Sequence, residues 1–234
     1  MSIVFPQDAG TLSALIVRAS DDEGLAQLRE PAKFEAAMRA VPHLARWTDP
    51  ADFEPITEVM PGGGLTNSYA GQPRLPGLFC VGDAVCTTNP AAGRGISLGL
   101  RQAVALLAMM AEDGRDPAAT AQRFEAWCDE HIEPWYEDHV YWDATLLRRF
   151  RGEDIDLDAR IPSDVICAAG EVDPQIMPAA APYMGMLAPP TILRSVEERA
   201  RAVLRTGWRP PLADGPTRDE LVEVIGDTQL SAAR

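Results

Sequence analysis

The chain has 234 residues, of which 35 are acidic and 21 are Lys or Arg, so its formal net charge is −14 at pH 7. This excess of negative charge argues against binding to nucleic acid or to an anionic membrane surface, because both would repel the chain. No uninterrupted apolar run approaches the roughly 20 residues of a transmembrane helix, so the sequence predicts no membrane span.

The first residues and the cysteines predict a cytoplasmic protein with reduced thiols. The opening sequence MSIVFPQDAG has neither the basic n-region nor the apolar h-region of a signal peptide. The four cysteines, Cys80, Cys86, Cys128 and Cys167, form no CxxC pair. Their spacing argues against a zinc ribbon or a redox dithiol, and no metal site is expected.

The N-terminal part combines a hairpin pattern with a helical pattern. The β-rich runs at residues 3–5 and 11–17 are joined by PQDAG, a turn composition, which predicts a β-hairpin. Residues 21–41 read as helical, and Pro31 is expected to split them into two segments. Residues 53–60, FEPITEVM, predict a strand, and the following PGGG predicts a loop.

The central part predicts a strand, a loop and a helix in succession. Residues 78–81 read as a short buried strand that ends at Gly82 and Asp83. A polar loop follows, and a helix is predicted from about Gly95 to Ala111. Apolar side chains surround most of this helix, so we expect it to be buried on several sides. Those side chains are Ile96, Leu98, Leu100, Val104, Leu106, Leu107, Met109 and Met110.

The C-terminal part reads as helical. Asp116 followed by Pro117 has the composition of a helix N-cap with proline at the first helical position. This helix is expected to extend to about Phe150, with a kink at Pro134. Pro-rich loops then alternate with short helices up to the C-terminus.

The strand–loop–helix segment has the composition of a ligand site. Asp83 is placed at the carboxyl end of the predicted strand, where its carboxylate can accept two hydrogen bonds from a diol. Gly93 and Gly95 allow the loop backbone to approach a flat ligand without a Cβ atom. The N-terminus of the following helix favours a group that becomes negative.

These residues carry a resemblance to a known family. GDAVCTTNPAAGRGISLGLRQA resembles the second flavin motif of the FAD-dependent aromatic-hydroxylase-like oxidoreductases, GDAxHxxxPxxGxGxxxAxxDA. The matching positions are Gly82, Asp83, Ala84, Pro90, Gly93, Gly95 and Ala103. The resemblance implies that Asp83 binds the ribityl chain of FAD and that residues 90–97 lie against the isoalloxazine. The implied cofactor-binding residues are Gly82, Asp83, Pro90, Gly93, Arg94, Gly95, Ile96 and Ser97.

The resemblance covers about residues 1–112 and implies an α/β fold. It predicts part of a substrate-domain β-sheet with helices in residues 1–74. It further predicts the last strand and helix of a Rossmann-like FAD/NAD(P)-binding domain in residues 75–113, and a helical region in residues 114–234. Such enzymes begin with a GxGxxG turn for the pyrophosphate, and this chain has none. The chain therefore reads as the C-terminal portion of a flavoprotein.

The implied function is that of an FAD-dependent monooxygenase oxidising a small organic substrate, with NAD(P)H as a candidate co-substrate. Two alternatives stay open: a flavin-dependent reductase or halogenase of the same superfamily, and a non-catalytic truncated or split subunit. In these readings the chain is expected to pair with a partner that supplies GxGxxG or to self-associate. The catalytic residues are unknown.

The sequence departs from the family motif at Cys86, where His is common, and at Gln102, where Asp precedes the final Ala. We expect Cys86 to be a small packing residue, because no His lies at a spacing that suggests a catalytic pair.

His131 and His139 are eight residues apart, about 12 Å along a helix, which is too far for one metal ion. Arg94 is expected to face the flavin, a substrate anion or solvent.

Aromatic residues recur at roughly helical spacing between residues 127 and 142. They could line a substrate pocket, but an aromatic core seam is the favoured interpretation. The residues are Trp127, Trp135, Tyr136, Tyr141 and Trp142.

Overall fold

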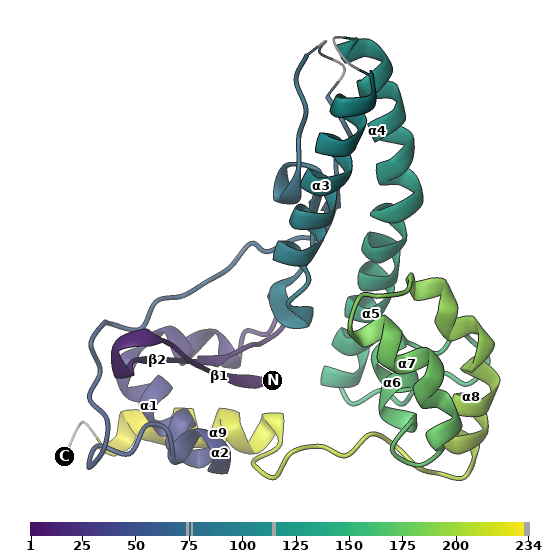
Figure 1. The fold of residues 1–234 in the computed structure, drawn as a ribbon. Helices are drawn as coiled ribbons and strands as arrows, with labels where there is room; N and C mark the ends of the chain where they lie inside the picture. Colours follow the sequence, from purple (N-terminus) through teal and green to yellow (C-terminus); the bar gives the residue numbers. More distant parts are fainter. Residues whose placement is uncertain (74, 76, 114–115, 232–234) are drawn as a thin grey trace. The chain divides into compact units, whose positions relative to one another are not determined.

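The computed structural model describes residues 1–73, 75, 77–113 and 116–231. The chain forms two compact units (Figure 1). Unit 1 comprises Met1–Gly64 and Pro211–Arg234, and unit 2 comprises Leu65–Pro210. The sequence analysis divides the chain after residues 74 and 113 instead. Those domain boundaries come from the family resemblance and not from packing, so they stay predictions. Residues 74, 76, 114, 115 and 232–234 of those predicted segments lie outside the described residues.

Unit 1 begins with the predicted hairpin, which the structure confirms. Strand β1 (Ser2–Pro6) pairs antiparallel with β2 (Leu12–Ile16), and Ser2 lies opposite Ile16. A short 3-10 segment, η1 (Asp8–Gly10), makes the turn between the strands. It uses left-handed backbone at Ala9 and Gly10, with φ values of 54° and 73°.

Helices cover this hairpin in unit 1. Pro31 splits the predicted helical run as expected, into η2 (Leu25–Arg29) and α1 (Pro31–Ala40), and α2 (Pro42–Ala45) follows. Helix α9 (Arg218–Ser231) packs on α1. Arg218 of α9 also donates two hydrogen bonds of 2.8 Å to the Asp22 carboxylate. The core residues are Leu25, Leu28, Ala37, Met38, Val41, Leu44, Leu221 and Ile225.

Unit 2 is built around three helices. Helix α3 (Gly95–Asp113) and α4 (Pro117–His131) pack side by side (Figure 1), and α5 (Glu133–Phe150) follows α4 after a break at Ile132. The Asp116 carboxylate caps α4 as predicted, accepting hydrogen bonds from the N–H groups of Ala118 and Ala119. The break lies next to Pro134, the position at which the sequence predicts a kink.

The remaining elements of unit 2 are short. Strands β3 (Ser68–Tyr69) and β4 (Cys86–Thr87) form a two-stranded antiparallel sheet. Single-turn 3-10 segments η3 (Gly82–Ala84) and η4 (Pro90–Ala92) flank β4. The C-terminal elements are α6 (Ser163–Ala169), η5 (Pro174–Ile176), α7 (Met177–Met184), η6 (Pro190–Ser195) and α8 (Glu197–Arg205).

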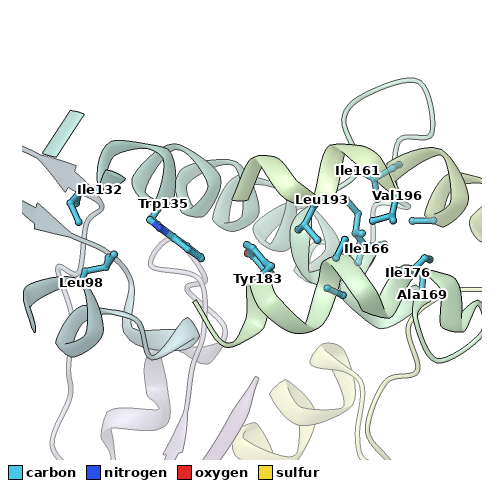
Figure 2. Close-up of a cluster of buried hydrophobic side chains, with 14 of the residues drawn as sticks. Leu98, Ile132, Trp135, Ile161, Ile166, Ala169, Ile176, Tyr183, Leu193 and Val196 are labelled. Carbon is cyan, nitrogen blue, oxygen red and sulfur yellow. The ribbon is translucent and has the colours of Figure 1, made fainter. Parts of the chain in front are cut away.

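One hydrophobic core runs through unit 2. Figure 2 shows Leu98 and Ile132 at one end of it, Trp135 and Tyr183 in the middle, and Ile176 at the other end. The Trp135 and Tyr183 rings are stacked with centroids 5.5 Å apart. The aromatic residues of α5 thus belong in part to the core, which supports the core-seam interpretation over a pocket lining.

The predicted α/β fold class is wrong. The described residues are mostly helical, and their only sheets are the two two-stranded ones, so they form no Rossmann-like sheet and no larger substrate-domain sheet. Residues 53–60 are irregular, and residues 78–81 form no strand. Val81 keeps extended backbone angles, with φ −138° and ψ 164°. A parallel strand needs neighbours to pair with, and the described chain offers this segment none.

The prediction that the helix beginning at Gly95 is buried on several sides is also wrong. Only Leu98 and Gln102 of α3 are fully buried. The apolar face of α3, defined as Ile96, Leu100, Val104, Leu107 and Met110, has side chains that are 44% to 81% exposed. The apolar composition of α3 therefore does not report its burial, because the described residues cover only one side of the helix.

Among the described residues, α3 is the one helix long and apolar enough to cross a membrane by length and composition. Its best 18-residue window has a mean hydropathy of 1.2. A single helix of this kind does not establish a membrane span, and the expected absence of a span stays a prediction.

Candidate functional site

The segment 82–97 that resembles the flavin motif forms a loop that leads into the first turn of α3; it is called the 82–97 loop below. Gly82 and Gly93 have left-handed backbone, with φ values of 63° and 66°, which favours glycine at both positions. Asn89 caps η4, because its side chain accepts a hydrogen bond of 3.1 Å from the N–H of Ala91. Pro90 then occupies the first position of η4, and Gly93 ends it before α3 begins at Gly95.

Asp83 lies beside the N-terminus of α3. Its side chain is exposed, and a Cβ atom added to Gly95 would be 3.7 Å from the Asp83 Oδ1 atom. The sequence thus brings a free carboxylate oxygen next to the positive end of a 19-residue helix. Ile96 and Ser97, in the first turn of this helix, are also exposed.

Gln102 anchors the start of the loop. Its Oε1 atom accepts a hydrogen bond of 2.6 Å from the N–H of Gly82. Its side chain is completely buried. The departure from the family motif at residue 102 therefore has a structural role in this chain, since the buried neutral amide of Gln102 accepts from the N–H of Gly82 without bringing a charge into the interior.

Arg94 is buried, although the sequence predicts that it faces a flavin, an anion or solvent. Its Nη1 atom is 3.3 Å from Oδ2 of Asp138, and its Nη2 atom donates to the Tyr183 hydroxyl. The guanidinium also lies 5.0 Å from the Trp135 ring centroid and 5.4 Å from that of Trp142. These contacts occupy the Arg94 side chain, so only its backbone can contribute to a site at the loop surface.

A polar cluster that the sequence does not reveal supports the loop at Asn89. The N–H of Asn89 donates to Asn67 Oδ1 at 2.7 Å, and Asn67 donates to Asp143 Oδ2, also at 2.7 Å. His139 is completely buried next to this cluster, with its Nε2 atom 3.6 Å from Asp143 Oδ2. These residues come from three distant parts of the sequence, and no spacing pattern joins them.

Cys86 is buried in β4, as the packing interpretation expects. Burial, with smaller contributions from Asp83 and Cys128, raises the pKa of the Cys86 thiol to about 11. The thiol is therefore almost entirely protonated at neutral pH, and a protonated thiol is a poor nucleophile.

The loop fits one part of a flavin and not the rest. A Cβ atom on Gly93 would meet nothing within 4 Å, and one on Gly95 would meet only Asp83, so the backbone is open to a flat ring. Asp83 is free to accept hydrogen bonds from ribityl hydroxyls. A pyrophosphate site of this family needs a glycine-rich turn that opens a helix. The only run of glycines in the sequence, Gly62–Gly64, lies in irregular chain in unit 1 and opens no helix.

Elsewhere in the described chain, neither clusters of metal-ligating side chains nor the clefts along α5 identify a ligand site. No group of three or more His, Cys, Asp or Glu side chains that could hold a metal ion occurs among the described residues. Two clefts of about 20 and 30 Å³ lie along α5, lined in part by Arg160, and neither includes a residue of the 82–97 loop. Each is about the size of a water molecule, so neither identifies a substrate or an NAD(P)H site.

Comparison of the chain with protein-family models, with curated proteins and with solved structures gave no match. The functional argument therefore depends on the geometry of the 82–97 loop and on its resemblance to the flavin motif.

Proposed function

We propose that the chain is the C-terminal portion of an FAD-dependent monooxygenase and supplies the isoalloxazine side of its flavin site. The observation that carries the proposal is the exposed Asp83 carboxylate beside the open N-terminus of α3, with Gly93 and Gly95 leaving the loop backbone bare. The substrate is a small organic molecule, and NAD(P)H is the reductant.

The chain's own residues have two tasks in this proposal. Asp83 accepts hydrogen bonds from the hydroxyls of the ribityl chain. The free N–H groups at the start of α3, in residues 95–97, point toward negative charge on the ring and stabilise it. Bound FAD supplies the oxidation chemistry, and the protein supplies its binding and orientation.

A second polypeptide segment completes the site in this proposal. The apolar face of α3 and the exposed side chains of Leu78 and Val81 are all near the loop in sequence, and the described residues leave them uncovered. Exposed apolar surface of this extent is typical of a protein interface. The proposed partner carries a GxGxxG turn for the pyrophosphate and covers this surface, and in its absence the chain self-associates.

The experiment that tests the proposal compares pieces of the cofactor. Riboflavin, FAD and ADP are each titrated into the 234-residue chain, and binding is followed by ligand-observed NMR. We expect weak binding of riboflavin and FAD with similar affinities, because the chain contacts only their shared part, and no binding of ADP. Absence of riboflavin binding at millimolar concentration contradicts the flavin site. Sub-micromolar FAD binding by a monodisperse monomer contradicts the need for a second segment.

Asp83→Ala is the matched variant for this titration. Loss of a hydrogen bond to a charged group costs about 1.5–3 kcal/mol, which corresponds to roughly 10- to 150-fold in riboflavin affinity. Asp158→Ala is the control, because Asp158 is an exposed aspartate of the same unit outside the loop. Equal affinities for the two variants would remove Asp83 from the site.

A further inference from the structure

The buried carboxylate of Asp138 joins the 82–97 loop to the C-terminal helices. It accepts hydrogen bonds from Arg160 at 2.7 Å, Ser163 at 3.0 Å and the Tyr183 hydroxyl at 2.7 Å, and it forms the ion pair with Arg94 at 3.3 Å. Asp138 is 1% exposed. A buried carboxylate is costly unless its lone pairs are filled, and here both oxygens have donors.

The donors come from separate parts of unit 2. Asp138 is on α5, Ser163 on α6, Tyr183 on α7, and Arg94 belongs to the loop itself. In the view of Figure 2, Trp135 and Tyr183 lie at neighbouring positions in the core, and the Arg94 guanidinium is over both rings, 5.0 and 4.9 Å from their centroids. Because these helices pack in one core, the position of the Arg94 side chain is fixed by α5 and α7.

The loop backbone needs such an anchor. Arg94 stands between Gly93 and Gly95, and glycines give the backbone more conformational freedom than other residues. The loop's own hydrogen bonds near this point are few: Gly93 N–H donates to Pro90 O at 2.9 Å, and Leu98 N–H donates to Arg94 O at 3.0 Å. A side chain held between two glycines restricts their backbone at the position where α3 begins.

We propose that Asp138 is a positioning residue, which through Arg94 holds the Gly93–Ser97 backbone in the conformation that presents the N-terminus of α3 to the flavin. The proposal rests on the proposed function for its ligand, but the control of the loop by Asp138 is a property of the chain alone. In this proposal the C-terminal helices α5 and α7 act on the flavin site through Arg94 and not through direct contact with the cofactor.

Hydrogen exchange of the intact chain, followed by mass spectrometry, tests this control. Asp138→Asn leaves Arg94 without its counter-charge, and we expect the hydrogen-bonded amides of Gly93 and Leu98 to exchange at least about tenfold faster than in the unsubstituted chain. The control is Asp164→Asn, which removes the ion pair between Asp164 of α6 and Arg149 of α5, both half-buried, without touching the loop. Peptides from α8 report on the general stability of unit 2.

A merely structural role for Asp138 makes a different prediction. In that case the loop and α8 lose protection together, in proportion to the loss of stability, and this result would overturn the proposal. Arg94→Lys keeps the charge without the planar guanidinium, and we expect it to retain part of the loop protection.

Tyr183→Phe covers the case in which Asp138→Asn does not fold. This variant keeps the ring and removes one hydrogen bond to Asp138 and one from Arg94. It should speed exchange of the loop selectively, though less than Asp138→Asn. Unchanged loop exchange in Tyr183→Phe overturns the proposal.

Riboflavin binding by the same samples separates the two proposals. If the unsubstituted chain binds no riboflavin while Asp138→Asn loosens the loop selectively, the proposed function fails and the control of the loop by Asp138 stands. If the unsubstituted chain binds riboflavin, and Asp138→Asn changes neither the affinity nor the loop exchange, the positioning role fails and the proposed function stands.

Discussion

Gly82 and Gly99 face each other where the loop crosses α3: a Cβ atom on Gly99 would be only 3.3 Å from the Cα atom of Gly82. The contact is tight because the Gly82 N–H must also reach Gln102, one turn further along the helix. Two glycines thus allow the chain that carries Asp83 to lie directly on α3.

Gly99→Val should separate these two segments. The added side chain must displace the Gly82 backbone, and overpacking of this kind typically costs about 1–3 kcal/mol of unfolding free energy. Urea denaturation measures the change. Gly226→Val is the control, because a Cβ atom there meets nothing within 4 Å and the residue is likewise within a helix. Equal stability of the two variants would show that the Gly82 backbone yields easily.

Gly95→Val should leave the fold intact and abolish riboflavin binding. The only contact of an added Cβ atom would be with Asp83 Oδ1 at an ordinary 3.7 Å, and Gly95 does not have left-handed backbone. A flat ring against the loop would, however, meet the branched side chain. Thermal unfolding and riboflavin titration measure the two effects. Normal riboflavin binding by a folded Gly95→Val variant would show that the loop does not touch the flavin.

Cys86 should behave as an unreactive core thiol. With its pKa raised to about 11, mainly by burial, the thiolate fraction at pH 8 is about one in a thousand. We expect iodoacetamide to modify Cys86 far more slowly in the native chain than in urea, as peptide mapping would show. Cys86→Ser should keep riboflavin affinity within about tenfold. Rapid native alkylation, or complete loss of binding in a folded Cys86→Ser variant, would contradict the packing role.

The apolar face of α3 should drive self-association of the chain when no partner is present. Sedimentation velocity should show species larger than the 25.4 kDa monomer. The double substitution Leu100→Glu and Leu107→Glu should shift the distribution to monomer without loss of stability, because both side chains are exposed. Leu187→Glu, at an exposed leucine outside α3, should not. A monomeric unsubstituted chain would contradict the prediction.

Acidification should destabilise unit 2 through His139. Burial lowers the pKa of His139 below its ordinary value of 6.5; Arg94 adds to this effect, whereas Asp143 and Asp138 oppose it. The unfolded chain therefore binds a proton more readily than the native chain, and stability falls as the pH drops below about 6.5.

Urea unfolding at pH 7.5 and 5.5 measures this dependence. His139→Phe should flatten the change in unfolding free energy between the two pH values. His131→Gln is the control, since His131 is only half-buried and stacks edge-on against Trp127, and it should keep the full change. An equal pH dependence in both variants would assign the effect to other groups.

The sequence by itself determined the elements that depend on neighbouring residues. The β1–β2 hairpin follows from alternating β-rich runs around a turn composition, and the division at Pro31 follows from the missing N–H of proline. Asp116 and Pro117 start α4, and Gly95 starts α3, at the predicted positions. In the candidate site, the left-handed backbone at Gly82 and Gly93 and the cap at Asn89 are likewise local features that depend on neighbouring residues.

Only the tertiary structure decided what these elements pack against. The segment 78–81 reads as a strand in the sequence, but a strand exists only if another strand pairs with it, and composition does not report the partner. Likewise, the apolar residues of α3 predict burial, although the described chain covers one side alone. Arg94 ion-pairs with Asp138, 44 residues away, and no periodicity connects two residues that meet only because α5 folds back beside the loop.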